Sequence, residues 1–377
     1  MDFRLAEEQQ MLADLVGRFV EKEYAFEARR KLSATPPGWS GQHWVTLADM
    51  GLLALNVPEE FGGMNAGAAE TMIVMEGLGR GLVLEPYLST AVLGARLLSR
   101  AGTDAQKSRW LPELVAGRLK TALATLEPGA RFDLSTIATT ARPSAAGFVI
   151  DGRKGVVMHG DSADLLLVST RTSGEQTSTA GITLFAIDPQ APGVTLRGFP
   201  ALDGQRVAEV SFSGVSVGAE AVLGAVDDGY PLLEWTVDHG TFALCAEAVG
   251  AMARLAELTY DYLRVRTQFG KPIGSFQALQ HRAADILTAV EQARSMVYFA
   301  ASRLDGEDTG ERTRALSAAK NVIGRSGRFV GQQAVQLHGG MGMTDELPVG
   351  WYFKRLVCID MTWGDVQHHL ERYGACL

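Results

Sequence analysis

The chain has 377 residues, of which 46% are hydrophobic and 21% charged, and its formal net charge is −8 at pH 7. This composition is typical of a globular protein of two or three domains. The negative balance argues against nucleic-acid binding, which needs a basic face. No apolar run reaches the length of a membrane span, and the start MDFRLAEEQQ does not resemble a signal peptide. Three widely spaced cysteines favour neither a disulfide framework nor a zinc knuckle, so we expect a reduced, cytoplasmic protein.

The first hundred residues are predicted to be mostly helical. Apolar side chains recur at helical spacing near the start of the chain, at Leu12, Leu15, Val16, Phe19 and Val20. Further helical patterns cover about 44–50, 68–79 and 90–100, and stretches rich in proline and glycine separate them.

The pattern changes near residue 120. Short apolar runs at 147–150, 165–168 and 182–187 are separated by turn residues, which favours the strands of a sandwich or barrel. A second helical block is predicted from about Tyr230 to the end, with interruptions at 270–274 and at the glycine cluster 339–342. The predicted order is therefore helices, strands and helices.

Three groups of residues, in this order, resemble motifs of the acyl-CoA dehydrogenase family over nearly the whole chain. They are WVTLADMGL at 44–52 with VPEEFGG at 57–63 and MEGLGR at 75–80, then RTQFGKPI at 266–273 with Phe276 and Gln277, and finally QLHGGMGMT at 336–344. The resemblance implies an α+β fold with three domains. These are an N-terminal helical domain (1–118), a central β-barrel (119–226) and a C-terminal four-helix bundle (227–377). It also implies FAD as cofactor and an acyl-CoA thioester as substrate.

The last two motifs suit a dinucleotide. Glycine lets a diphosphate approach the backbone closely, and Arg266 offers a forked cation. The resemblance implies FAD contacts from Arg266, Gln268, Phe269, Phe276, Gln277, Gln336, Leu337, His338, Gly339 and Gly340. In the family these motifs reach a flavin bound mainly by a neighbouring subunit, so a dimer at least is implied. The alternative is that the glycines form only a helix–helix turn and that Arg266 makes a surface ion pair.

The barrel segment that usually faces the flavin departs from the family. The usual Thr-Glu-Pro followed by Gly-Ser-Asp is here LEPGARFD at 126–133, so Leu126 and Phe132 replace two hydroxyl residues. The usual Trp-Ile-Thr of the next strand is here VVM at 156–158. Backbone N–H groups could still meet the flavin edge, or Phe132 and Met158 could be ordinary core residues.

The catalytic base also departs from the family. The reaction removes an α-proton and passes a β-hydride to flavin N5, so a carboxylate must lie at the α-carbon. Where many members carry Tyr-Glu-Gly-Thr, this chain has TWGD at 362–365, and the other position used in the family falls near Gly240. Glu247 is the predicted base, because it lies two helical turns from Gly240 on a face of small residues that would form a shallow groove. A structural ion pair of Glu247, a base at Asp365, or no base on this chain are the alternatives.

Three functions follow from these observations. The first is FAD-dependent α,β-dehydrogenation of an acyl-CoA by a homodimer or tetramer, with electrons passed to an electron-transfer flavoprotein. The second is a partner subunit in a heterotetramer with a paralogue, because the C-terminal loop and the residues around Glu247 resemble a heteromeric branch acting on dicarboxylic or steroid-side-chain substrates. The third is an oxidase-like or hydroxylating flavoenzyme. Asp238 and His239 lie close to the presumed site, but an interpretation as solvated residues at a helix start explains them equally well. No metal site is predicted.

Overall fold

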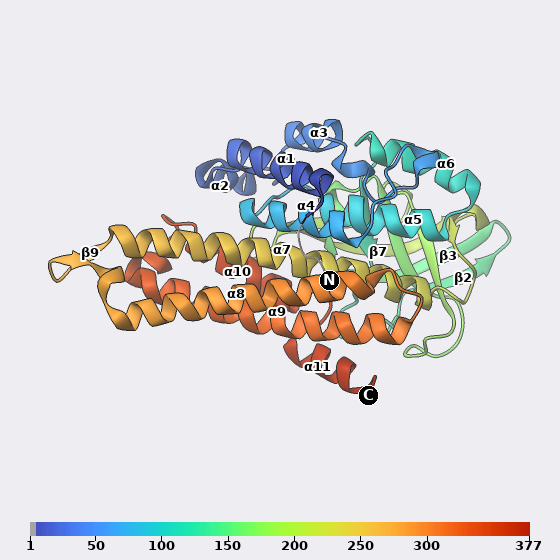
Figure 1. Ribbon diagram of the computed structural model, residues 1–377. Helices are drawn as coiled ribbons and strands as arrows, with labels where there is room; N and C mark the ends of the chain where they lie inside the picture. The colour runs from blue at the N-terminus through green and yellow to red at the C-terminus, as the bar shows by residue number, and fades with distance from the viewer. Residues whose placement is uncertain (1–4) are drawn as a thin grey trace. The chain divides into compact units, whose positions relative to one another are not determined.

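The computed structural model describes residues 5–377, and its elements follow the predicted order of helices, strands and helices (Figure 1). The chain divides into two compact units. The helical unit comprises residues 5–31, 68–83 and 241–377, and the sheet unit comprises residues 32–67 and 84–240. The predicted combination of N-terminal helices, a central β domain and a C-terminal helical bundle is confirmed.

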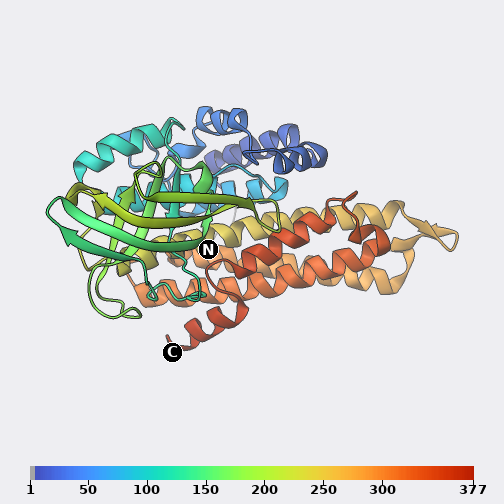
Figure 2. The ribbon, with the colours of Figure 1, turned by 180° about the vertical axis from the view of Figure 1, so that it is seen from behind.

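The helical unit is built around a bundle of long helices that run side by side (Figures 1 and 2). These are α7 (Tyr230–Val265, within the unit from residue 241), α8 (Gln277–Leu304), α9 (Thr309–His338) and α10 (Val349–Met361). A hairpin of β9 (Thr267–Gln268) and β10 (Lys271–Pro272) projects from one end of the bundle, and η6 (Ile273–Ser275) leads into α8. The 3-10 turn η7 (Gly339–Met343) follows α9, and α11 (Val366–Gly374) is the last helix.

The N-terminal helices of this unit are α1 (Glu7–Glu23), α2 (Phe26–Ala34) and α4 (Ala68–Gly81). Val16 and Phe19, which belong to the apolar helical pattern predicted near the start of the chain, are buried in α1. Gly77 of α4 lies beneath Val16, and a Cβ atom at Gly77 would come within 2.5 Å of the Val16 side chain. A glycine at this point therefore lets the two helices approach closely.

The sheet unit contains a mixed eight-stranded sheet in the order β6-β7-β3-β2-β4-β5-β8, with β1 paired in parallel to β4. The strands are β1 (Thr121–Ala124), β2 (Thr140–Ser144), β3 (Gly147–Met158), β4 (Leu165–Arg171), β5 (Ile182–Ile187), β6 (Val194–Pro200), β7 (Arg206–Val217) and β8 (Val222–Leu223). The helices of the unit are α3 (Gly41–Asp49), α5 (Ala95–Ala101) and α6 (Asp104–Val115), with short segments η1 (Leu52–Ala54), η2 (Glu59–Phe61), π-helical η3 (Leu88–Gly94), η4 (Gly160–Ser162) and η5 (Ala219–Ala221).

Burial explains the sequence pattern of the central strands. All six residues of β5 are buried, and β5 lies between β4 and β8, as expected for a continuous apolar run. The core of the sheet is built from side chains such as Ile150, Val168, Phe185 and Val210.

Polar side chains fix the points at which several helices begin. Ser40, Thr103, Asp308 and Asp365 each accept a hydrogen bond from a backbone N–H in the first turn of α3, α6, α9 and α11, respectively. Such N-caps satisfy donors that a helix leaves unpaired. Within residues 5–377, no helix is long and apolar enough to cross a membrane.

Candidate active site

The two motifs predicted to contact FAD lie at the same end of the helical bundle (Figure 1). The Tyr262 ring near the end of α7 stacks on the His338 ring at the end of α9, with 4.3 Å between centroids. The Tyr262 hydroxyl also donates to the His338 carbonyl oxygen at 3.4 Å. The β9–β10 hairpin begins just after α7, and η7 directly follows α9. The fold therefore brings together two segments that are about seventy residues apart in the chain.

The predicted FAD contacts differ in exposure. Side chains able to meet a ligand from outside are exposed or half-buried: Arg266, Gln268, Phe269, Phe276, Gln277 and Gln336. Phe269 is 90% exposed, has a positive φ of 54°, and packs edge-on against Phe276 at 6.0 Å. Leu337 and His338 are buried, and burial lowers the pKa of His338, which favours the neutral ring. We expect these two residues to act through packing and backbone.

The backbone at the start of η7 suits the close approach of a phosphate group. Gly339 and Gly340 are exposed, and a Cβ atom added at either residue would meet nothing within 4 Å. Gly339 has a φ of +60°, which favours glycine. Together with the guanidinium of Arg266 and the nearby amide side chains, this surface has donors that fit a diphosphate and the polar groups of a dinucleotide. The individual contacts remain predictions.

Glu247, the predicted base, is held by an arginine. Its two carboxylate oxygens accept hydrogen bonds from Nε and Nη2 of Arg355 in α10, each at 2.6 Å. Glu247 is 5% exposed and Arg355 7%, so the pair is buried. This contact is the ion pair that the structural alternative expected. Because both oxygens are engaged, a base role for Glu247 would require the pair to loosen, and that role remains a prediction.

The small-residue face around Glu247 is covered by another helix. A Cβ atom at Gly79 of α4 would lie 2.1 Å from the Glu247 carbonyl oxygen, and one at Gly250 would lie 1.9 Å from the Glu76 carbonyl oxygen. Only glycine permits such close backbone contact. The expectation of an open groove along this face is therefore wrong, because the small residues serve the crossing of α4 and α7.

The C-terminal loop that replaces the family's glutamate segment is anchored by a lysine. Lys320 of α9 is fully buried and donates to the carbonyl oxygens of Asp360, Thr362 and Gly364, at 3.0, 3.1 and 2.7 Å. Burial lowers the pKa of Lys320 to about 8. The ammonium therefore ties the end of α10 and the start of the loop to α9.

The two residues of this loop that matter for the base have different surroundings. Trp363 has a positive φ of 54° and is buried, so its indole occupies an interior position. The carboxylate of Asp365 accepts the backbone N–H of His368 at 2.9 Å and caps α11. A capping role thus accounts for Asp365, while its role as a base remains a prediction.

Asp238 and His239 lie well inside α7 rather than at its start, because α7 begins at Tyr230. Both are only 1% exposed. His239 packs against the Trp235 ring at 4.1 Å, and its Nδ1 lies 2.8 Å from the Trp235 carbonyl oxygen. Their interpretation as solvated residues at a helix start is therefore wrong, because both are buried about two turns inside a helix that begins at Tyr230, as predicted for the second helical block.

The altered barrel segment runs along β3. The Gly155 N–H donates to the Leu126 carbonyl oxygen at 2.8 Å. Leu126, Phe132 and Met158 are all half-buried, whereas the core of the sheet is built from other side chains. These three residues therefore lie outside the core of the sheet unit, and their contact with the flavin remains a prediction.

The helical unit also contains a cavity of about 340 Å³ near the end of α4. Three arginines line it, but each has a structural partner. Arg29 donates to the Leu82 carbonyl oxygen at 3.0 Å, and Arg80 and Arg254 share the carboxylate of Glu257 at 2.8 to 3.0 Å. These contacts account for the arginines as links among α2, α4 and α7.

Comparisons with known proteins decide the family. Models of the acyl-CoA dehydrogenase N-terminal, middle and C-terminal domains match residues 6–118, 122–215 and 227–374. The chain belongs to the acyl-CoA dehydrogenase family. Members of this family are FAD-dependent oxidoreductases that act on CH–CH groups.

Similar proteins include members from mycobacteria. Acyl-CoA dehydrogenase FadE12 of Mycobacterium tuberculosis is 31% identical over 91% of this chain and 89% of its own length. The ChsE4–ChsE5 complex of Mycobacterium tuberculosis superposes with a TM-score of 0.90 at 27% identity, covering 100% of this chain and 98% of that chain. The FAD complex of PigA superposes with a TM-score of 0.90 at 26% identity, covering 100% and 98%. All three similarities extend over nearly the whole acyl-CoA dehydrogenase fold.

Sequence reasoning missed the buried cations of this acyl-CoA dehydrogenase fold, among them Lys154, Lys320 and Arg355. Apolar or small residues flank each on one side: Lys154 precedes Gly-Val-Val in a strand, Lys320 follows Ser-Ala-Ala in a helix, and Arg355 precedes Leu-Val in a helix. A lysine or arginine at a position where the hydrophobic periodicity predicts an apolar side chain is the signal that could have identified them. Their partners could not be identified in this way, because the partners come from distant segments.

Proposed function

We propose that the chain introduces a double bond between Cα and Cβ of an acyl-CoA thioester, in an assembly in which the bundle end reaches FAD bound mainly by a second subunit. The observation that supports this most directly is the shared bundle end, where Tyr262 stacks on His338. Exposed Arg266 follows Tyr262 by one helical turn, and the open backbone of Gly339 and Gly340 follows His338. Bound FAD supplies the acceptor for the β-hydride at N5. The protein must then remove the α-proton with a base and exclude water from the thioester.

The visible spectrum of the purified protein tests this function. We expect a flavin spectrum that bleaches on anaerobic addition of one member of a panel of acyl-CoAs. Bleaching would identify the substrate class, and reoxidation by an electron-transfer flavoprotein rather than by oxygen would identify the acceptor. The Arg266→Ala variant should retain less FAD, because a charge-assisted phosphate contact is lost. A protein that takes up no FAD, alone or with any partner, contradicts the proposal.

Glu247→Gln tests the base, because glutamine keeps the shape but removes the basic lone pairs. If Glu247 is the base, flavin reduction slows by about 100-fold or more while the fold persists. If Glu247 is only the partner of Arg355, the variant loses stability and the folded fraction reduces its flavin at the parent rate. Glu257→Gln is the matched control, since Glu257 lies ten residues further along α7 and pairs with Arg80 and Arg254 on the protein surface.

A partner subunit in a heteromeric dehydrogenase is the second candidate function. Two observations favour it: the loss of hydroxyl groups at Leu126 and Phe132, and the similarity to chains of the ChsE4–ChsE5 complex. We expect an oligomer in either case, with a large apolar interface. Molecular size together with the flavin-to-protein absorbance ratio separates the candidates. A fully loaded, active homo-oligomer would exclude the partner-subunit function, and a monomer with full FAD would contradict both.

A further inference from the structure

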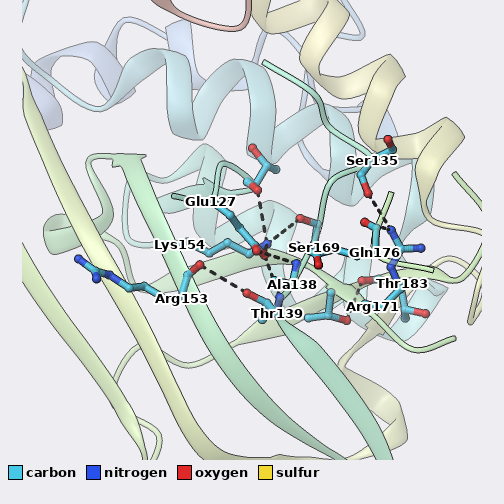
Figure 3. A network of polar contacts seen from close by, with 12 residues as sticks. Glu127, Ser135, Ala138, Thr139, Arg153, Lys154, Ser169, Arg171, Gln176 and Thr183 are labelled. Carbon is cyan, nitrogen blue, oxygen red and sulfur yellow. Dashed lines mark hydrogen bonds and ion pairs between the residues drawn. The ribbon is translucent and has the colours of Figure 1, made fainter. Parts of the chain in front are cut away.

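A carboxylate closes the barrel segment that bears Phe132. Glu127 lies just before this segment, and its two oxygens accept the backbone N–H groups of Ala138 and Thr139 at 2.7 and 3.1 Å (Figure 3). The Glu127 side chain is 6% exposed. One buried carboxylate thus joins the two ends of the stretch 128–137, which we name the clasped segment.

Lys154 completes this closure from a neighbouring strand. Its ammonium lies 2.6 Å from Oε1 of Glu127, and it also donates to the Ser169 hydroxyl at 3.2 Å and to the Thr125 carbonyl oxygen at 3.4 Å (Figure 3). The Lys154 side chain is fully buried. Its three donors therefore all meet acceptors, and the contact ties the start of the clasped segment to both β3 and β4.

A second cation holds the far part of the clasped segment. Arg171 at the end of β4 donates to the Ser135 carbonyl oxygen at 2.7 Å and to the Ser178 and Ala180 carbonyl oxygens at 2.8 and 2.6 Å. Between the two anchors, Asp133 accepts the Ser135 N–H at 2.9 Å in a local turn. In the middle of the segment, Arg131 has a φ of +50° and is exposed. The anchors at the ends of the segment and this local turn together set its conformation.

The chemistry of Glu127 explains why this site is charged rather than apolar. A buried ion pair gives little net stability compared with well-packed apolar residues. An apolar side chain, however, cannot accept the N–H groups of Ala138 and Thr139, and leaving the N–H of buried Thr139 unpaired is costly. An ionised carboxylate accepts both, and it needs a cation beside it to remain ionised in the interior. Lys154 provides that cation, so the pair determines the geometry of this segment.

We propose that Glu127 and Lys154 are positioning residues that hold the clasped segment in the conformation required to contact the flavin. The role in flavin binding rests on the proposed function, whereas the clasp itself does not. Two further properties agree with this role. Burial lowers the pKa of Lys154 to about 8, with Arg171 adding to the effect and Glu127 opposing it. Lys154 and its hydrogen bonds to Glu127 set the pKa of that carboxyl below its usual value despite burial, so the pair is charged at neutral pH.

Trypsin digestion tests the clasp without reference to flavin. Arg131 is an exposed cleavage site in the middle of the clasped segment. In the Lys154→Met variant we expect cleavage after Arg131 to rise by about tenfold or more, because opening of the segment limits cleavage. Lys120→Met is the matched control, since the Lys120 ammonium pairs with the Asp164 carboxylate in the same unit, also at 2.6 Å. We expect trypsin to cleave this variant after Arg131 at the parent rate. An unchanged cleavage rate in folded Lys154→Met overturns the clasp.

Hydrogen exchange of the parent protein covers the case in which Lys154→Met fails to fold. The amides of Ala138 and Thr139 donate to the Glu127 carboxylate, so they should exchange about tenfold more slowly than the amide of exposed Arg131 in the middle of the clasped segment. Equal exchange rates overturn the clasp.

Titration with FAD tests the role in flavin binding. We expect Lys154→Met to weaken FAD binding by about tenfold or more and to change the visible circular dichroism of bound flavin, while Lys154→Arg restores part of both, since arginine keeps the charge. Faster cleavage with unchanged FAD affinity and spectrum overturns the positioning role. A parent protein that binds no FAD instead contradicts the proposed function, and proteolysis and hydrogen exchange still decide the clasp.

Discussion

Lys154 in the sheet unit and Lys320 in the helical unit are both fully buried, yet they hold different partners. Lys154 meets the carboxylate of Glu127, whereas Lys320 meets three carbonyl oxygens at the end of α10. Burial lowers the pKa of both to about 8. The comparison shows that two equally buried lysines can differ in how much the stability of the fold depends on them. Removing Lys154 leaves a buried charge, whereas the groups that Lys320 directly binds are dipoles.

The largest expected effect is that of Lys154→Met on stability. A carboxylate left without its cation in the interior should lower the free energy of unfolding by about 3–5 kcal/mol. Denaturation followed by circular dichroism measures this loss. The control Lys120→Met should cost no more than about 1 kcal/mol, because its partner Asp164 has a side chain that is 44% exposed. Similar losses in the two variants would show that other groups compensate the negative charge of Glu127 when Lys154 is absent.

Lys320→Met should have a smaller effect. The carbonyl oxygens of Asp360, Thr362 and Gly364 would lose a donor, at a cost of about 1–3 kcal/mol. The same denaturation experiment measures it. A loss as large as that of Lys154→Met would remove the distinction between the two sites. It would indicate that the nearby charges of Asp360 and Asp365, which favour the charged form of Lys320, act as its real partners.

The pH dependence of stability sharpens the comparison. The folded pKa of Lys320 is about 8 and its usual value is 10.5, so between these values the unfolded chain binds more protons. The contribution of Lys320 to the free energy of unfolding therefore rises as the pH increases through this window, and it is lost as the pH falls through about 8.

The measurement is the difference in unfolding free energy between the parent and Lys320→Met at pH about 7 and about 9.5, which should increase with pH. Groups that titrate in both proteins and do not interact with Lys320 cancel in this difference. A difference that does not change with pH would mean that the carbonyl oxygens stabilise the ammonium as strongly as water does.

The sequence predicted the periodic and motif-bearing parts of this fold well, for physical reasons. The apolar run 182–187 coincides with β5, and the glycine cluster at 339–342 falls within η7, because a buried strand and a glycine turn are local properties. The surroundings of Glu247 could not be predicted in the same way. Its partner Arg355 is 108 residues away, and the backbone of α4 lies against the face that was expected to be open. Such contacts depend on tertiary packing, which a single periodicity does not encode.

The smallest expected effects concern Asp365, in the loop that Lys320 anchors. Its carboxylate caps α11, so Asp365→Ala should lower stability by about 1 kcal/mol, while Asp365→Asn should be nearly neutral because asparagine caps equally well. This difference makes asparagine the informative variant. If Asp365 is the base, Asp365→Asn slows flavin reduction by about 100-fold or more at unchanged stability. If it is only a cap, Asp365→Asn reduces its flavin at the parent rate. The base must then be Glu247 released from Arg355, or a group supplied by a partner subunit.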